Sequence, residues 1–185
     1  MRVISGEFGG RRLLTPVGDT TRPTTDKVRQ AVFNSLASSG LLDGAVVADL
    51  YAGCGALGLE AISRGAERCT FVERDRNALA ALRGNIETLD LGSRATVVSS
   101  DVMAWVPAMR NIDIVFADPP YSFDGWDKLL SLIKAPVVVA EADREVATPL
   151  GWEQLRSRRY GRTWVTVLEQ QIGRASCRER VCSTV

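Results

Sequence analysis

The stretch DLYAGCGALG occupies residues 49–58. It begins within the end of an apolar, β-branched run at 45–50 and continues into a helical pattern at 56–64. A strand, a glycine-rich loop and a helix in this order are typical of a parallel α/β sheet. Gly53 and Gly55 allow a tight turn and close approach of the backbone to a ligand, and Gly58 allows tight packing of the helix. Such a loop fits a dinucleotide, S-adenosylmethionine or a turn that binds nothing.

Strand-like and helix-like segments alternate around this loop. Apolar periodicity predicts a helix from Thr24 or Thr25 to about residue 39 and, downstream, strands at 69–73, 95–99, 112–117 and 136–140. Between these strands we expect helices at 77–89, near residue 105 and at 126–133. Residues 152–158 and 163–169 are expected to form a closing hairpin. The alternation predicts a parallel sheet covered by helices on both faces.

The two ends of the chain are interpreted separately from this body. Two β-like runs at 2–5 and 11–14 flank three glycines and predict a hairpin. We therefore divide the chain into a hairpin extension at 1–20, a domain at 21–171 and a tail at 172–185. The tail has no apolar period and resembles the translation of a common sequencing adaptor, so we expect it to be foreign to the fold. The alternative is a genuine basic tail that binds nucleic acid.

Composition excludes several classes of function. The chain has 185 residues and no histidine, which excludes Ser-His and Cys-His catalysis and histidine-ligated metals. Without the tail only Cys54 and Cys69 remain, and their spacing indicates neither a disulfide framework nor a metal site. No apolar run has the length of a membrane span and no signal peptide opens the chain, so we expect a cytoplasmic protein without membrane contact.

Charge is unevenly distributed along the chain. Residues 1–35 carry six basic and three acidic side chains, and residues 144–166 carry five basic and two acidic ones. Residues 36–143 carry nine basic and fifteen acidic side chains. Basic ends around an acidic middle indicate a rim that binds a polyanion, with a chance scatter of surface charge as the alternative.

Acidic residues stand where the next two strands end. Glu73 lies 24 residues after Asp49, where an acid accepts hydrogen bonds from ribose hydroxyls, or is simply a solvated acid before a helix. Asp101 follows the third strand, and it can accept from an adenine amino group or cap the next helix. Because ligands of α/β sheets bind at the carboxyl ends of the strands, both acids are candidate cofactor residues.

The fourth strand leads into Asp118, Pro119, Pro120 and Tyr121. Two prolines fix the backbone and remove two N–H donors, so the carboxylate and the nearby carbonyls form a corner that only accepts hydrogen bonds. The neighbouring tyrosine can stack on a base. An exocyclic amino group needs such acceptors for its two N–H bonds, so this motif predicts an enzyme that acts on a base amine.

Together these motifs resemble class I S-adenosylmethionine-dependent amino-methyltransferases, and most closely the RsmD family, which methylates N2 of one guanine in 16S ribosomal RNA. The matching stretches run in order through residues 1–171: RVISG (2–6), GGRRL (9–13), RPT (22–24), VR (28–29), VFN (32–34), DLYAGCGALGLEA (49–61), SRGA (63–66), FVE (71–73) and DPPY (118–121). The family often has Phe and Ser where this chain has Tyr51 and Cys54, and both changes are mild.

The resemblance implies a Rossmann-like mixed seven-stranded sheet with helices on both faces, plus the small N-terminal hairpin. It implies S-adenosylmethionine as cofactor, held by Asp49, Tyr51, Gly53, Gly55, Gly58, Glu73, Asp101 and Thr24. Catalysis would rest on Asp118, Pro119, Pro120 and Tyr121. RNA phosphates would meet Arg2, Arg11, Arg12 and Arg22, with further cations at Arg156, Arg158, Arg159 and Arg162. The expected partner is 16S RNA within a small-subunit particle, bound by a monomer.

Three other functions remain as alternatives. An amino-methyltransferase of DNA adenine or cytosine uses the same corner but usually carries a larger target-recognition insertion, for which this chain has no room. A nicotinamide-dependent oxidoreductase would leave the DPPY motif unexplained, and no Tyr-x-x-x-Lys pair is present for proton transfer. A non-catalytic RNA-binding module would not need the glycine loop.

Overall fold

A computed structural model describes residues 1–16 and 26–171 of the chain. The described elements are α1 (Asp26–Ser38), β1 (Val46–Leu50), α2 (Ala56–Ser63), β2 (Arg68–Glu73), α3 (Arg76–Thr88), β3 (Ala95–Ser99), α4 (Val102–Trp105), the 3₁₀ turn η1 (Val106–Ala108), β4 (Ile114–Ala117), α5 (Trp126–Leu132), β5 (Val137–Ala142), β6 (Trp152–Tyr160) and β7 (Thr163–Gln170). The expected strand ends differ from these bounds by at most two residues.

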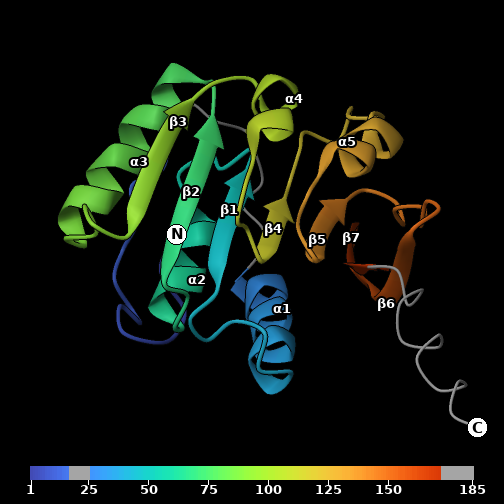
Figure 1. The fold of residues 1–185 in the computed structure, drawn as a ribbon. Helices are drawn as coiled ribbons and strands as arrows, with labels where there is room; N and C mark the ends of the chain where they lie inside the picture. Colours follow the sequence, from blue (N-terminus) through green and yellow to red (C-terminus); the bar gives the residue numbers. More distant parts are fainter. Residues whose placement is uncertain (17–25, 172–185) are drawn as a thin grey trace, which may run out of the picture.

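The strands form one seven-stranded sheet in the order β3-β2-β1-β4-β5-β7-β6 (Figure 1). Neighbours among β1 to β5 pair in parallel, whereas β7 pairs antiparallel with both β5 and β6. The central strands β1, β4 and β5 are almost entirely buried, as apolar strands covered on both sides must be. The expected mixed seven-stranded sheet is confirmed.

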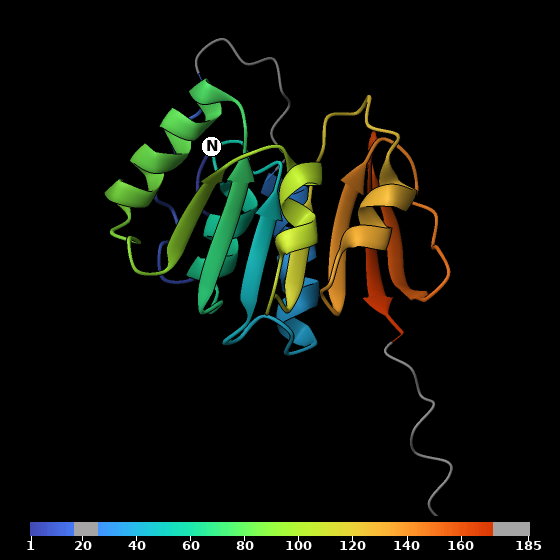
Figure 2. The ribbon, with the colours of Figure 1, turned by 45° about the horizontal axis from the view of Figure 1, so that its top comes forward.

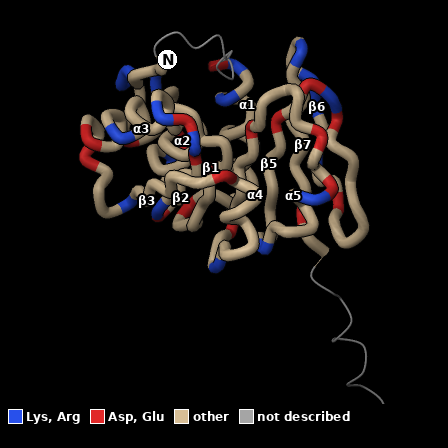
Figure 3. The backbone as a smooth tube through the Cα atoms, turned by 90° about the horizontal axis from the view of Figure 1, so that it is seen from above, with Lys and Arg blue, Asp and Glu red and all other residues tan. Residues whose placement is uncertain are grey.

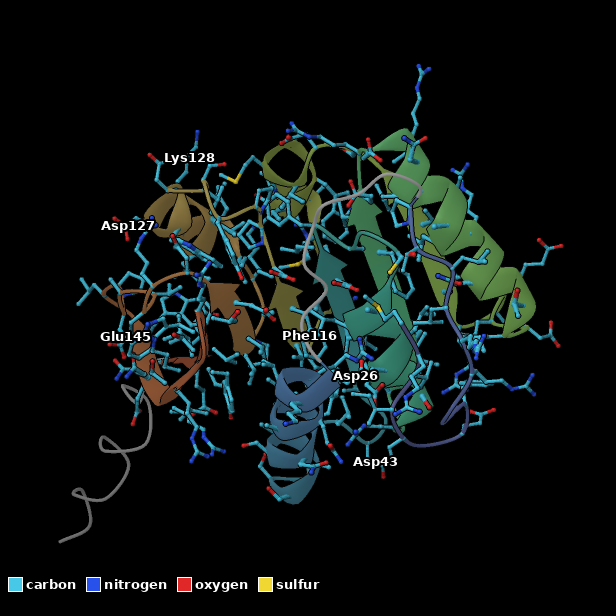
Figure 4. All side chains as sticks on the ribbon, turned by 180° about the vertical axis from the view of Figure 1, so that it is seen from behind. Asp26, Asp43, Phe116, Asp127, Lys128 and Glu145 are labelled. Atoms are coloured by element: carbon cyan, nitrogen blue, oxygen red, sulfur yellow. The ribbon has the colours of Figure 1, made fainter. Side chains whose placement is uncertain are left out.

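Helices cover both faces of this sheet (Figure 2). On one face α1, α2 and α3 enclose a core in which Phe33 of α1 lies 5.2 Å from Phe116 of β4, measured between ring centroids. Figure 4 shows this face, with Asp26 at the start of α1 and Phe116 beside the helix. On the other face α4, η1 and α5 pack on β1, β4 and β5. The expected covering of both faces of the sheet by helices is therefore confirmed.

The N-terminal arm, residues 1–16, pairs with itself less than the sequence predicted. Its two halves share a single antiparallel bridge, between Arg2 and Arg12, instead of two strands. The N–H groups of Ile4 and Ser5 donate to the buried Glu60 of α2 at 2.7 and 3.2 Å, so they are not available to a longer ladder. The arm is thus fastened to α2 by side-chain acceptors.

The arm also joins the main core. Val3 and Leu13 are buried together with residues of α1 and α2. Asn85 of α3, itself 1% exposed, accepts the Leu14 N–H at 2.7 Å and donates to the Leu14 carbonyl at 3.1 Å. The same amide donates to the Cys54 carbonyl in the glycine loop at 2.9 Å. One side chain therefore connects the arm, α3 and the loop after β1.

None of the helices in the described part of the chain is long and apolar enough to span a membrane.

Candidate active site

The strand order places a ligand crevice between the ends of β1 and β4. After β1 the chain continues to β2 on one side, whereas β4 lies on the other, and Leu50 is in register with Ala117. Open α/β sheets bind ligands where the strand order changes direction, at the carboxyl ends of the strands. The glycine loop after β1 and residues 118–121 after β4 both start at this point.

The three glycines of the loop have different surroundings. Gly55 is the N-cap of α2 with φ of +87°, and a β-carbon there would lie 2.5 Å from Cδ1 of Leu82. A β-carbon on Gly58 would lie 2.3 Å from the ring of Phe71 on β2. At Gly53, by contrast, it would meet nothing within 4 Å among the described residues. The loop is therefore closed toward the sheet and open on the side where a ligand would lie.

Asp49 lies beneath this loop. Its side chain is 1% exposed, and Oδ2 accepts the Gly58 N–H at 2.8 Å. Burial raises the pKa of Asp49 well above its usual value, and the nearby carboxylates of Asp118 and Glu73 raise the pKa further. Asp49 therefore fixes the first turn of α2, and a direct contact with a cofactor stays a prediction.

Glu73 reaches the loop from the end of β2. Its Oε2 accepts the Gly53 N–H at 2.8 Å, and its Oε1 accepts the N–H groups of Arg74 and Asp75 at 2.7 and 2.8 Å. A carboxylate has about four lone-pair sites, so three backbone donors leave it one for a hydroxyl group. This half-buried acid beside an open glycine fits the expected ribose contact.

Asp101 follows β3 and Tyr51 follows β1. Asp101 accepts the Met103 N–H at 2.9 Å as N-cap of α4, and it forms an ion pair with Arg74 at 3.0 Å. Helix capping, one of the two roles considered for Asp101, is thus present, and the contact with adenine stays a prediction.

Tyr51 has a partly buried hydroxyl. Burial raises the pKa of Tyr51 to about 12, with a contribution from Asp101. The Tyr51 ring packs 5.7 Å from that of Phe123.

Residues 118–121 form a rigid turn beside the loop. Asp118 is half-buried, Pro119 is buried, and Pro120 and Tyr121 are exposed. The Asp118 N–H points to the Leu50 carbonyl of β1 at 3.5 Å, and the N–H of Phe123 donates to the Pro120 carbonyl at 2.8 Å. The Tyr121 hydroxyl lies 3.1 Å from Oγ1 of Thr163 at the start of β7. The turn is therefore held by one contact with β1 and another with β7.

Of the four expected RNA-binding arginines, the structure describes Arg2, Arg11 and Arg12, all in the N-terminal arm. Arg11 and Arg12 are exposed, and Arg2 forms an ion pair with Asp26 at 3.6 Å. The turn of the arm packs on Ser63 at the end of α2, roughly 12 Å along the helix from the glycine loop. Figure 3, viewed onto the carboxyl ends of the strands, shows further basic residues along β6. Thr24 and Arg22 fall outside the described residues, so their roles stay predictions.

Four residues around the site were missed by sequence reasoning: Arg74, Asn85, Phe123 and Thr163. Arg74 directly follows Glu73, and an arginine beside a candidate ribose acid was a visible signal. Phe123 is an aromatic residue two positions after the DPPY motif, which was a signal too. Asn85 and Thr163 act through hydrogen bonds across the fold, and nothing in their local sequence marks them.

Comparisons with known proteins agree with this geometry. The family described as "Conserved hypothetical protein 95" matches residues 1–169. The chain is 39% identical over 185 residues to "Putative rRNA methyltransferase YlbH" of Bacillus subtilis, which covers 92% of this chain and 100% of that protein. It is 33% identical over 178 residues to "Ribosomal RNA small subunit methyltransferase D" of Haemophilus influenzae, with 87% and 89% covered.

A solved structure shows the same fold. "Putative methyltransferase yhhF from Escherichia coli" superposes with a TM-score of 0.80 and 34% identity, over 92% of this chain and 98% of that one. The resemblance noted in the sequence is therefore confirmed, and the chain belongs to the RsmD family of methyltransferases, with their class I Rossmann-like fold.

Proposed function

We propose that this protein transfers a methyl group from S-adenosylmethionine to the exocyclic N2 amine of a guanine in 16S ribosomal RNA. The observation that carries the proposal is that residues 118–121 and the open glycine loop follow the paired ends of β4 and β1, so they lie side by side. We expect the Asp118 carboxylate and the Pro119 carbonyl to form the acceptor corner there. Two curated relatives support it, since their names describe ribosomal RNA methyltransferases. When bound, S-adenosylmethionine supplies an electrophilic methyl group on its sulfonium.

The residues of the crevice fit this cofactor. Gly53 leaves the backbone open to a close-lying ligand, and Glu73 has an acceptor site left for ribose hydroxyls. We expect Tyr51 and Asp101 to hold the adenine ring and its amino group. Asp49 acts from below by fixing Gly58, and Thr24 would complete the site from the segment before α1.

Asp118 and the Pro119 carbonyl would hold the two N–H bonds of the target amine. The lone pair of a guanine amine is delocalised into the ring, which makes the amine a weak nucleophile. Two fixed acceptors favour the pyramidal geometry that localises this lone pair on nitrogen, and they orient it for in-line attack. Most of the rate gain would then come from positioning and electrostatics, and the proton released after transfer would pass to Asp118 or water.

The RNA must present its base unstacked, in a loop or flipped out of a helix. Tyr121 is 44% exposed, so a base can lie against its ring. Exposed arginines of the N-terminal arm and of β6 would neutralise phosphates around the base. We expect a cytoplasmic monomer acting on a small-subunit particle.

Two measurements test this function. Titration calorimetry should detect binding of S-adenosylmethionine and none of NAD, which separates a methyltransferase from an oxidoreductase. Methyl transfer to small ribosomal subunits that lack the modification, with the product base mapped, should yield N2-methylguanine. Methylation of DNA adenine or cytosine, and none of the ribosomal RNA, would instead establish the alternative substrate.

The arm makes a separate prediction. In an Arg11→Ala/Arg12→Ala double variant, RNA affinity should fall and the slope of log affinity against log salt should flatten by about two, because about two phosphate contacts are lost. Both side chains are exposed, so S-adenosylmethionine affinity should not change. The matched control is Arg110→Ala/Lys134→Ala, which removes the same charge from exposed positions outside the arm and β6. An equal loss of cofactor affinity would contradict the assignment to RNA.

A further inference from the structure

The turn between β6 and β7 reaches the edge of the sheet that carries the DPPY motif. Because β7 is antiparallel to β5, the start of β7 pairs with the carboxyl end of β5, with Trp164 opposite Ala142. Thr163 and Tyr160 form the last pair before the turn. A hairpin from the far end of the chain is thereby placed beside residues 118–121.

One contact links this hairpin to the motif. The hydroxyls of Tyr121 and Thr163, 42 residues apart in sequence, lie 3.1 Å from each other. The backbone on the other side of Tyr121 is fixed by the turn between Pro120 and Phe123. The ring is thus held at both of its ends, while nearly half of the residue's surface is open to a stacking partner.

The same turn carries cations. The guanidinium of Arg158 lies 5.9 Å from the centroid of the Tyr160 ring, and Nε of Arg159 donates to the Gly161 carbonyl at 2.9 Å. Arg162 is exposed at the turn itself. Phosphates next to a target base would meet these side chains, so the hairpin that fixes the Tyr121 hydroxyl would also contact the RNA around that base.

We infer that Thr163 is a positioning residue for the target base: its hydroxyl fixes the position of the Tyr121 ring against which the base stacks. This inference rests on the proposed function. Thr163 touches neither cofactor nor the reacting amine, so it acts only through Tyr121. Loss of its hydroxyl would let the Tyr121 side chain swing away from this position, and the amine would then meet Asp118 less often in the geometry for transfer.

A double-mutant cycle tests the inference. Thr163→Val and Tyr121→Phe each remove one hydroxyl of the pair, and each should lower kcat for RNA methylation about fivefold, the effect of one neutral hydrogen bond. The double variant should lose no more than either single variant, because both remove the same contact. Thr163→Ser keeps the hydroxyl and should retain the wild-type rate. S-adenosylmethionine affinity and thermal stability should be those of the wild type in all four variants.

The control variant is Ser157→Ala, which removes another hydroxyl pair of the same hairpin, with Thr166 at 3.4 Å. It should leave kcat unchanged. The inference is overturned if Thr163→Val methylates RNA at the wild-type rate, if the two single losses multiply in the double variant, or if Ser157→Ala loses as much. Failure of the proposed function is distinguishable, because the wild-type protein itself would then methylate no guanine.

Discussion

The Asp118→Ala variant is expected to bind S-adenosylmethionine and to transfer no measurable methyl group. Removal of one preorganised polar group at a reacting centre typically costs about 10²–10³ in kcat, and Asp118 would hold the amine as well as stabilise its developing positive charge. The fold should persist, because the half-buried side chain lies at a turn after β4 and outside both cores. Radiolabelled methyl transfer and titration calorimetry measure the two properties separately.

Two further variants sharpen this test. Asp118→Asn keeps one acceptor oxygen but loses the negative charge, so its loss of kcat should be smaller than that of alanine. Asp124→Ala removes an exposed carboxylate from the same loop and should leave kcat unchanged. Turnover of Asp118→Ala near the wild-type rate would remove this carboxylate from the mechanism, whatever its effect on RNA affinity.

Glu60→Ala is expected to destabilise the protein by about 3–5 kcal/mol, the usual cost of removing one partner from a buried ion pair. Glu60 is fully buried, with Nε of Arg64 at 2.6 Å and Nε of Arg29 at 3.7 Å. Burial lowers the pKa of Arg29, and the charge of Glu60 opposes that change. Among the described residues, Nε and Nη1 of Arg29 already have no hydrogen-bond partner. Without Glu60 the buried cation would lose its main compensation.

The free energy of unfolding from urea titration measures this effect. Glu67→Ala is the matched control, because Glu67 pairs with Arg68 on the surface at 3.0 Å and such pairs contribute at most about 1 kcal/mol. Glu60→Gln should fall between the two, since its amide oxygen can still accept from Ile4 or Ser5. A change below about 1 kcal/mol in Glu60→Ala would show that the buried network is not what holds the arm.

Local patterns in the sequence were enough to locate the crevice. Gly55, Gly58 and the two prolines have constraints that depend on neighbours in the chain, and the sheet brings their loops together because parallel strands end at one edge. Asp101 shows the limit of such patterns, since an acid after a strand can bind a ligand or cap the next helix. The structure shows the cap, whereas the residues around Asp101 in the sequence favour neither role over the other.

Contacts made across the fold could not be predicted in the same way. The bond between Tyr121 and Thr163 depends on β7 returning antiparallel beside β5, which no local period records. The arm was expected to be a regular hairpin because its two runs are β-like and separated by glycines. The N–H groups of Ile4 and Ser5 instead donate to the buried carboxylate of Glu60, which is 56 residues away from Ile4 in the sequence. Competition between such acceptors is decided only by packing.

The amide of Asn85 has a practical consequence for experiments on the arm. Deleting residues 1–16 would remove more than a set of arginines: it would take away both backbone partners that Leu14 offers to Asn85 and leave the pockets of Val3 and Leu13 empty. The Asn85 amide would then keep only its hydrogen bond to the Cys54 carbonyl, which lies in the glycine loop. A truncated enzyme that lost activity would therefore report on the loop as much as on RNA, and single charge substitutions are the informative probe.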